Sequence, residues 1–325
     1  MSRPVVVIAR VLLGAGIEAL EDRFEVRSGG LDATPERIRE LAAGASGLVA
    51  DASVRVDSGL LDAAGPQLRV VANFAVGVDN VDLDACRARG VLVTNTPEVL
   101  TNATAELALA LTLAAARLLS EAERDLRAGR WRGWDPAAYR GLELSGAAVG
   151  VIGLGRIGRR FAELLRGFEV ELLYWSRTAK PEAETELGAK RVELPDLLSR
   201  SDVVSLHAPA TPETRHLIDA EAIERIGPEG VLVNTARGPL VDLEALTAAL
   251  HDGKLGAAGL DVYENEPAVS PKLVRLAKAG KVTLLPHMGS ATIEGRVEMG
   301  EKVIINIRTF LDNHKPPDRV LPSML

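Results

Sequence analysis

Three glycines with the spacing G-x-G-x-x-G, Gly153, Gly155 and Gly158, lie in "VGVIGLGRIGRRFAELL", between an apolar run and an amphipathic segment. In a strand–turn–helix unit the first glycine permits a tight turn, the second lets a pyrophosphate approach the backbone, and the third lets the helix pack on the strand. The backbone N–H groups of Arg156 and Ile157, at the start of the predicted helix, would face the phosphates. The spacing alone is a weak signal, but its context favours dinucleotide binding over an ordinary turn.

The segment "YWSRT" follows the next predicted strand, about 20 residues after the glycines, where a carboxylate usually binds the ribose of NAD. Ser176 stands at that point and removes the charge that would repel a 2′-phosphate. Arg177 offers a forked, permanently charged donor, Thr178 adds a hydroxyl group, and Lys180 adds charge. We predict that the site prefers NADP(H), with NAD(H) also possible. The alternative is that Arg177 is a solvated surface residue and the site takes NAD.

Three further segments follow predicted strands, at the sheet edge where open α/β folds bind ligands, and they contain Arg237, Glu266 and His287. With these segments the chain resembles the D-2-hydroxyacid dehydrogenase family. The motifs that carry the resemblance, in order, are "NFAVGVDNVDL", "VGVIGLGRIG", "NTARG", "DVYENEP" and "PHMGSAT". Five ordered motifs over nearly the whole chain are far more specific than any one of them. "YWSRT" and "WRGWDP" resemble the glyoxylate/hydroxypyruvate reductase branch.

The resemblance implies reduction of a small 2-keto acid to the D-2-hydroxy acid by hydride transfer. Negative charge then develops on the carbonyl oxygen, which a histidine is suited to protonate because its ordinary pKa lies near neutrality. His287 is therefore assigned as general acid in reduction and general base in oxidation, and Glu266 as the carboxylate that orients it. Arg237 would bind the substrate carboxylate and polarise the carbonyl. Glu264, the nearby competitor for the role of Glu266, is expected to be solvated.

The same resemblance places other groups around substrate and cofactor. Val76 and Gly77 would offer backbone N–H groups to the substrate carboxylate, and Ser53 would form a wall of the pocket. Trp134 resembles a residue that reaches the neighbouring subunit's active site, with local packing as the alternative. The expected neighbours of the nicotinamide end are Thr104, Thr235, Ala236, Asp261, His287 and Gly289. The expected wall of the adenosine side comprises His207, Pro209 and Thr214.

Alternating apolar runs and helical patterns predict the elements that must position these residues. Strands are expected at 4–9, 24–28, 46–50, 68–74 and 91–96, and again at 147–152, 170–175, 202–206, 230–234, 256–260 and 281–285. Thr34 and Pro35 form a good N-cap and first-turn pair. One long helix is expected over 103–129; its first half is apolar nearly all round, so it must be buried in the core or against a second subunit. A last helix is expected over 290–313.

This order predicts an α/β protein with two Rossmann-like or flavodoxin-like domains, parallel sheets with helices on both faces, and an active site in the interdomain cleft. The resemblance implies a discontinuous substrate-binding domain, residues 1–98 plus 290–325. The NAD(P)-binding domain, residues 99–289, would be inserted between its two parts.

Composition narrows the class of partner. The chain has 325 residues, 47% of them apolar, and a net charge of −7, which disfavours nucleic-acid binding. No apolar run approaches a membrane span or a signal peptide, so a membrane partner is not expected. The sole cysteine, Cys86, is expected in packing and fits a cytoplasmic location. No metal is expected, because no cluster has zinc-ligand spacing. His216, His251 and His314 are expected on the surface.

The long helix and the "RWRGWDP" segment favour a homodimer. Alternatives within the family are oxidation of D-3-phosphoglycerate or another D-2-hydroxy acid, formate oxidation, which the acid at Glu266 disfavours, and phosphite oxidation. A non-enzymatic alternative is a dinucleotide-sensing, corepressor-like binding protein, which would need no catalytic groups.

Overall fold

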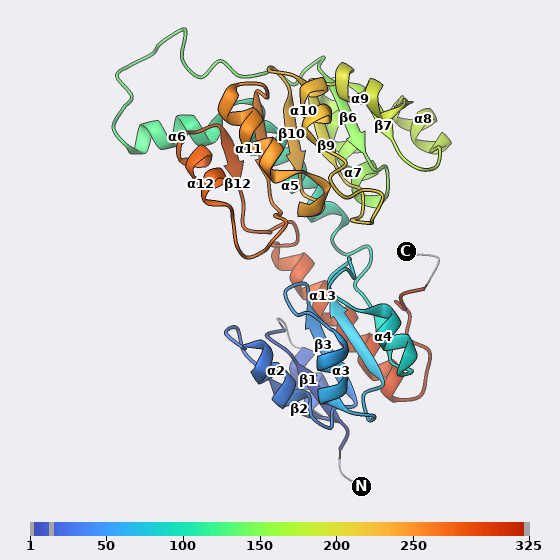
Figure 1. Cartoon of the computed structure of the whole chain (residues 1–325). Coiled ribbons are helices and arrows are strands. Elements are labelled where there is room, and N and C mark those ends of the chain that lie inside the picture. Colours follow the sequence, from blue (N-terminus) through green and yellow to red (C-terminus); the bar gives the residue numbers. More distant parts are fainter. Residues whose placement is uncertain (1–2, 13–15, 322–325) are drawn as a thin grey trace. The chain divides into compact units, whose positions relative to one another are not determined.

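The computed structural model describes residues 3–12 and 16–321. The chain forms two compact units, the first made of Met1–Leu100 with Ser290–Leu325 and the second of Thr101–Gly289 (Figure 1). The outermost residues of the predicted substrate-binding domain, 1–2 and 322–325, lie outside the described residues. Each unit is an α/β layer structure, as the alternating sequence pattern predicts.

The first unit has a five-stranded parallel sheet in the order β2-β1-β3-β4-β5. Its strands are β1 (Val5–Ile8), β2 (Glu25–Ser28), β3 (Gly47–Asp51), β4 (Val70–Phe74) and β5 (Leu92–Thr94). Its helices are α1 (Gly16–Glu21), α2 (Pro35–Ala42), α3 (Ser58–Ala64), α4 (Leu83–Ala88) and α13 (Ile293–Leu311). The predicted cap is confirmed: Thr34 Oγ1 accepts the backbone N–H of Arg37, with Pro35 in the first helical position.

Helices cover both faces of this sheet. Helices α2, α3 and α4 enclose one apolar core, which contains Ile38, Leu61 and the fully buried Cys86. Helix α13 packs on the opposite face beside α1, where Val303 and Ile307 are buried. A fully buried aliphatic side chain stabilises a fold by roughly 1.5–3 kcal/mol. The C-terminal helix therefore belongs to the core of the first unit, although the whole of the second unit, Thr101–Gly289, separates them in the sequence.

The second unit has a seven-stranded parallel sheet in the order β12-β11-β10-β9-β6-β7-β8. Its strands are β6 (Ala148–Ile152), β7 (Glu171–Trp175), β8 (Lys190–Arg191), β9 (Val203–Leu206), β10 (Val231–Asn234), β11 (Ala257–Leu260) and β12 (Val282–Leu284). Its helices are α5 (Thr101–Ala116), α6 (Leu119–Arg127), α7 (Arg156–Leu164), α8 (Pro181–Leu187), α9 (Leu194–Arg200), α10 (Ala220–Ile226), α11 (Leu243–Asp252) and α12 (Pro271–Lys278). Two 3-10 turns, Leu165–Phe168 and Gly238–Leu240, complete it.

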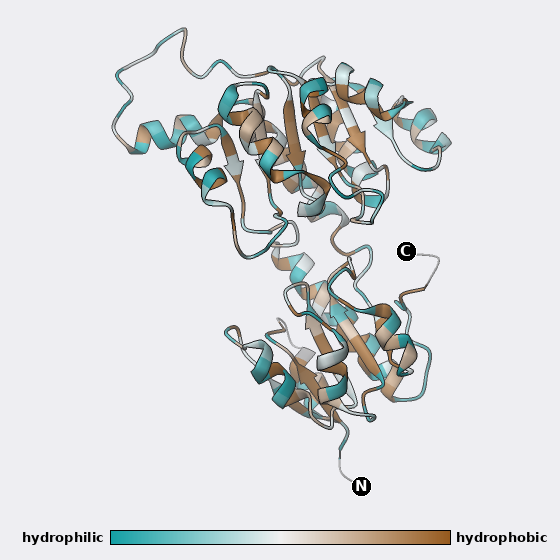
Figure 2. Cartoon of the chain, in the orientation of Figure 1, coloured by the Kyte–Doolittle hydropathy of each residue, from teal (hydrophilic) through white to brown (hydrophobic). Residues whose placement is uncertain are grey.

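Two cores flank this sheet. One lies under α9, α10, α11 and α12, and the other under α5, α7 and α8. The central strands are hydrophobic along their length while the helices are hydrophobic mainly on one side (Figure 2). Strands that are buried on both faces consist of continuous apolar residues, and this is why their positions could be predicted from the sequence.

The single helix expected over 103–129 is wrong. Leu118 adopts a left-handed conformation (φ 53°) and divides the segment into α5 and α6. Seven of the sixteen residues of helix α5 are buried within its own unit, where the helix packs against α7, β10 and β11. Strand β8 was not expected from the sequence, because its two residues are both charged and exposed.

No single helix among the described residues is long and apolar enough to cross a membrane, although the bent pair α5 and α6 meets that criterion when the two are taken together.

Each sheet has one point where the strand order reverses. In the second unit the chain runs outward from β6 through β7 to β8 and then returns to β9 on the other side of β6. In the first unit the reversal lies between β1 and β3. Loops that leave neighbouring strands in opposite directions at such a point open a crevice for a ligand. The glycine loop follows β6, so it lies at the reversal point of the second unit.

Candidate active site

The glycine loop has the conformation that its spacing predicts. Gly153 has φ +93°, and a Cβ there would lie 2.6 Å from the backbone nitrogen of Ala208. At Gly158 a Cβ would overlap the carbonyl oxygen of Gly153. The turn and the close helix packing therefore both require the absence of a side chain.

Gly155 differs from these two glycines. It is the N-cap of α7 with an ordinary extended backbone, and a Cβ built on it meets no described atom within 4 Å. Nothing in the protein itself demands glycine at this position, whereas a phosphate group approaching the helix N-terminus would. The buried hydroxyl of Thr235 also makes no hydrogen bond within the described chain. An orphaned buried hydroxyl and an unfilled cradle both fit a dinucleotide.

His207 lies directly beneath this loop. Its backbone N–H donates to Ile152 O (2.7 Å), and its ring contacts Phe161 with ring centroids 5.0 Å apart. Ser205 Oγ lies 2.9 Å from His207 Nε2. Removal from water lowers the pKa of His207 to about 3, so the ring is neutral at physiological pH. His207 thus supports the glycine loop as an uncharged packing group.

The segment from Ser176 to Lys180 is held in place at both ends. Ser176 Oγ donates to Thr178 O (2.6 Å), and the Lys180 N–H donates to the hydroxyl of Tyr174 (2.9 Å). Arg177 lies between them and is exposed. Its side chain is therefore presented from a fixed loop toward solvent, where a ribose phosphate can reach it.

Arg191 was missed by the sequence reasoning. It lies on β8, opposite Tyr174 in the strand register, and its Nη2 donates to Ser176 O (3.2 Å). Hydrogen bonds from the Thr211 side chain and from its own backbone lower the pKa of Glu213, and the charge of Arg177 adds to this effect. Only pairing of β8 with β7 brings Arg191 to this loop, and no local sequence pattern signals it.

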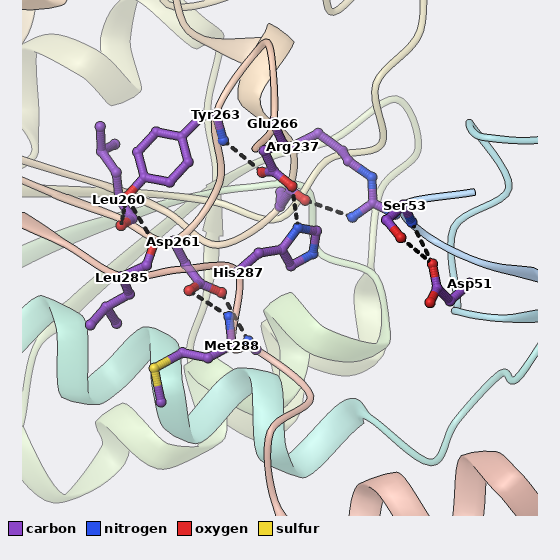
Figure 3. A network of polar contacts seen from close by, with 12 residues as sticks. Asp51, Ser53, Arg237, Leu260, Asp261, Tyr263, Glu266, Leu285, His287 and Met288 are labelled. Carbon is purple, nitrogen blue, oxygen red and sulfur yellow. Dashed lines mark hydrogen bonds and ion pairs between the residues drawn. The ribbon is translucent and has the colours of Figure 1, made fainter. Parts of the chain in front are cut away.

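His287 and Glu266 are brought into direct contact (Figure 3). His287 Nδ1 lies 2.6 Å from Glu266 Oε2, and Glu266 Oε1 accepts the backbone N–H of Tyr263 (2.8 Å). Burial alone would raise the pKa of Glu266. The hydrogen bonds from His287 and Tyr263, with the charges of His287 and Arg237, outweigh it and hold the pKa below its ordinary value. The carboxylate is therefore ionised at neutral pH and fixes Nε2 as the outward nitrogen of the ring.

Asp261 holds the backbone at His287. His287 has φ 53°, a conformation that non-glycine residues adopt only when the surroundings hold it. Its N–H donates to Asp261 O (2.9 Å), while the Asp261 carboxylate accepts the N–H groups of Met288 (2.8 Å) and Gly289 (2.9 Å). Burial raises the pKa of this carboxyl group, and those N–H donors and the charge of His287 offset part of the effect. The strained turn is thus secured by one buried acid.

Arg237 follows β10 and is half-buried. Its Nη1 donates to Ala236 O (2.8 Å), and Asn234 Nδ2 donates to its carbonyl oxygen (2.8 Å). At Gly238 a Cβ would overlap the backbone of Tyr263. The loop that carries Arg237 is therefore packed backbone to backbone against the loop that carries Glu266.

Four of the residues expected at the nicotinamide end, Thr104, Asp261, His287 and Gly289, are connected by hydrogen bonds. Thr104 Oγ1 donates to Gly289 O (3.1 Å), and Asp261 is fully buried beside them. Direct contacts of Thr104 and Asp261 with a cofactor stay predictions; both already have partners in the protein. On the adenosine side, Thr214 Oγ1 donates to Pro209 O (2.7 Å), which closes that loop on itself.

The substrate-binding residues predicted in the first unit lie at the ends of β3 and β4. Ser53 donates its N–H (2.8 Å) and its hydroxyl (2.5 Å) to Asp51 Oδ1, as Figure 3 shows. The carbonyls of Val76 and Gly77 accept side-chain N–H groups of Asn95 (2.7 Å) and Asn73 (2.8 Å), which fixes both peptide planes.

Arg10 was also missed by the sequence reasoning. Its Nη1 donates to Ser53 Oγ (3.2 Å) at the reversal point of the first sheet.

The expectation that Glu264 is solvated is wrong, whereas His216, expected on the surface, has a side chain that is 33% exposed. Glu264 Oε1 lies 2.6 Å from Arg215 Nη2 and 3.4 Å from His216 Nε2, and its side chain is 22% exposed. Glu264 is thus paired away from His287, which leaves Glu266 as the acid beside the imidazole.

Trp134 lies on the long loop after α6 (Figure 1) and is 86% exposed, so the local-packing alternative is wrong. Trp131, on the same loop, is also exposed.

Cys86 is buried as expected; burial and the nearby Asp82 raise the pKa of its thiol to about 11. No group of acidic, histidine or cysteine side chains suited to a metal ion occurs among residues 3–12 and 16–321.

A parallel sheet with a glycine loop at its reversal point, bordered by an arginine and a histidine–carboxylate pair, defines a dinucleotide-binding α/β protein with an acid–base site. Residues 109–289 match the family described as D-isomer specific 2-hydroxyacid dehydrogenase, NAD binding domain. The chain is 44% identical to a glyoxylate reductase of Thermococcus kodakarensis over 98% of this chain and 96% of that one.

Solved structures agree with this match. A protein from Thermus thermophilus is 40% identical with a TM-score of 0.90, covering 98% of this chain and 100% of that one. The NADPH-dependent glyoxylate/hydroxypyruvate reductase of Sinorhizobium meliloti, solved with NADP and malonate, is 35% identical with a TM-score of 0.86, covering 98% and 97%. The chain belongs to the D-isomer specific 2-hydroxyacid dehydrogenases. It is an enzyme of that family, and its cofactor is a nicotinamide dinucleotide.

Proposed function

We propose that this enzyme reduces glyoxylate or hydroxypyruvate to the D-2-hydroxy acid with NADPH. The names of the relatives support the substrate class, because those at 41–44% identity over nearly the whole chain are glyoxylate reductases. We further propose that residues 1–98 plus 290–325 bind the substrate and residues 99–289 bind the cofactor. The expected cytoplasmic location stays a prediction.

In this proposal the nicotinamide, when bound, supplies the hydride that reaches the carbonyl carbon of the substrate. His287 Nε2 then donates its proton to the carbonyl oxygen, so hydride and proton together complete the alcohol. Glu266 holds the ring through Nδ1 and stabilises its cationic form before the transfer. Arg237 binds the substrate carboxylate with its planar fork and places positive charge beside the carbonyl oxygen.

The observation that carries this proposal is the 2.6 Å contact between His287 Nδ1 and Glu266 Oε2. A dinucleotide sensor has no need of an imidazole held in one tautomer by an ionised acid. The ordinary alternative, a structural ion pair, does not explain why His287 occupies a strained backbone conformation.

Loss of NADPH absorbance with a panel of 2-keto acids tests the function. Glyoxylate and hydroxypyruvate should be reduced with higher kcat/KM than pyruvate and bulkier acids. His287→Gln should lower kcat by about 10²–10⁴-fold, the usual contribution of general acid catalysis, while NADPH still binds. Near-normal turnover of that variant, or no turnover of any acid by the wild-type enzyme, would contradict the proposal.

The preference for NADPH over NADH rests on the loop after β7. Ser176 stands where an acid would repel the 2′-phosphate, and Arg177 and Arg191 place two guanidinium groups at that loop. The kcat/KM ratio for NADPH against NADH should fall about tenfold or more in a Ser176→Asp, Arg177→Ala variant, because a charge-assisted hydrogen bond contributes roughly 1.5–3 kcal/mol. Arg225→Ala, at an exposed arginine of α10, is the matched control. An unchanged ratio would refute the preference.

We also propose that the enzyme is a homodimer in which Trp134 reaches the partner's active site. The described chain leaves Trp134 and Trp131 exposed on one loop, an unusual position for two large aromatic groups. Light scattering should give twice the chain mass. Trp134→Ala should raise KM for the keto acid without changing the mass, and a monomeric wild-type enzyme would refute both statements.

A further inference from the structure

Three loops at the carboxyl edge of the second sheet contact one another in sequence. We call them the β9 loop (207–219), the β10 loop (235–242) and the β11 loop (261–270). The β9 loop carries the residues expected to wall the adenosine, the β10 loop carries Arg237, and the β11 loop carries Glu266. The contacts among them bear on whether cofactor binding and acid–base chemistry are coupled.

The β9 and β10 loops are joined through their backbones. The His216 N–H donates to Pro239 O (2.8 Å), and the Ile218 N–H donates to Leu240 O (3.0 Å). The β10 and β11 loops are joined by close packing, since a Cβ on Gly238 would overlap Tyr263. Side chains have no room to separate these segments, so the three loops form one packed edge.

Glu264 links the β11 loop directly to the β9 loop. Its Oε1 accepts from Arg215 Nη2 at 2.6 Å and lies 3.4 Å from His216 Nε2. His216 has φ 50°, which a non-glycine residue adopts when its partners compensate the strain. Two residues further along the β11 loop, Glu266 makes its contact with His287. The β11 loop therefore contacts the β9 loop through Glu264 and the imidazole of His287 through Glu266.

We propose that Glu264 is a positioning residue, which ties the cofactor-binding β9 loop to the β11 loop so that a bound dinucleotide and a correctly placed Glu266 require each other. This inference rests on the proposed function. The pair is neither a simple surface bridge nor a core contact: the Arg215 side chain is 56% exposed and that of Glu264 22%. An isolated surface pair with such exposure would contribute little, whereas a pair that bridges two functional loops changes their geometry.

Glu264→Ala and Arg215→Ala test the coupling through two readouts. The Kd for NADPH, measured by fluorescence without substrate, should rise about three- to tenfold, and kcat with the best keto acid should fall by a similar factor. The double variant should be no worse than Glu264→Ala, because both changes break one link. Glu264→Gln, which keeps an oxygen for Arg215, should recover part of both losses.

The matched control is Glu221→Ala, which breaks a comparable pair with Arg225 (2.8 Å) on α10 and should change neither quantity. A wild-type Kd in Glu264→Ala, or effects that add in the double variant, would overturn the proposal. If Glu264→Ala loses its fold by circular dichroism, Glu264→Gln, which keeps the volume of the side chain, and Arg215→Ala, at a more exposed position, decide the question. If the wild-type enzyme reduces no keto acid, the proposed function fails, and the substrate-free Kd still decides whether Glu264 acts on the cofactor loop.

Discussion

Replacing Glu266 by glutamine removes the negative charge of the acid–base pair and keeps nearly the same side-chain shape. The two carboxylate oxygens each accept one hydrogen bond, Oε1 from the Tyr263 N–H at 2.8 Å and Oε2 at 2.6 Å from His287 Nδ1. A glutamine has only one acceptor oxygen, so its amide must face one of these donors with an N–H group. Glu266→Gln is therefore not a conservative change, and either the imidazole or the β11 loop loses its partner.

The expected magnitude follows from the burial of the pair. A hydrogen bond to a charged group contributes about 1.5–3 kcal/mol, and solvent reaches 38% of the His287 and 32% of the Glu266 side chain, so the lower half of that range applies. About 1.5–2 kcal/mol corresponds to roughly a 10- to 30-fold loss of kcat.

The pH dependence of the His287–Glu266 pair follows from the pKa of Glu266. The pKa of Glu266 is held below its ordinary value of 4.5, so the pair is intact throughout the neutral range, and its contribution is lost only as the pH falls below that value toward the lowered pKa. Steady-state kcat from about pH 3.5 to 8, with NADPH binding as the test of folding, measures this loss, and Glu221→Gln is the control. A Glu266→Gln enzyme with kcat within about twofold of wild type at neutral pH would refute this account of the pair.

Substitutions at three glycines should distinguish effects on stability from effects on ligand binding, and the reactivity of the one cysteine should show whether its thiol is buried. Gly155→Ala should change unfolding free energy by at most about 1 kcal/mol, because its Cβ meets no described atom within 4 Å, yet weaken NADPH binding about tenfold or more; equal loss of stability and affinity would contradict this. Gly158→Ala, whose Cβ would overlap Gly153 O, should instead lower the melting temperature by several degrees. Gly238→Ala should lower kcat/KM for the keto acid by displacing the loop of Arg237, and unchanged kinetics would argue against that packing. Cys86, buried and with a pKa raised to about 11, should resist a thiol reagent at about pH 8 and react once denatured; rapid native labelling would contradict its burial.

The positions of most strands and the glycine loop could be predicted from the sequence, and the family resemblance also implied the contact between His287 and Glu266. Strands buried on both faces form continuous apolar runs, and the glycines stand where backbone atoms approach too closely for a Cβ, as at Gly153 and Gly158. Apolar runs and glycine spacing are both patterns of neighbouring residues, so they can be recognised in the sequence. The break at Leu118 was not predicted, because neither neighbouring segment contains a proline or glycine to mark it.

Only the tertiary structure decided which charged groups meet. Arg191 reaches the loop of Ser176 because β8 pairs with β7, and Glu264 is occupied by Arg215 from another loop. The structure gives these two acids, which are only two residues apart, different partners: Glu264 pairs with Arg215, and Glu266 contacts His287. Ion pairs across loops depend on side chains far apart in sequence, and no periodicity or composition encodes them. The sequence by itself determined the fold class and the chemical groups available; their partners were set by packing of the folded sheet.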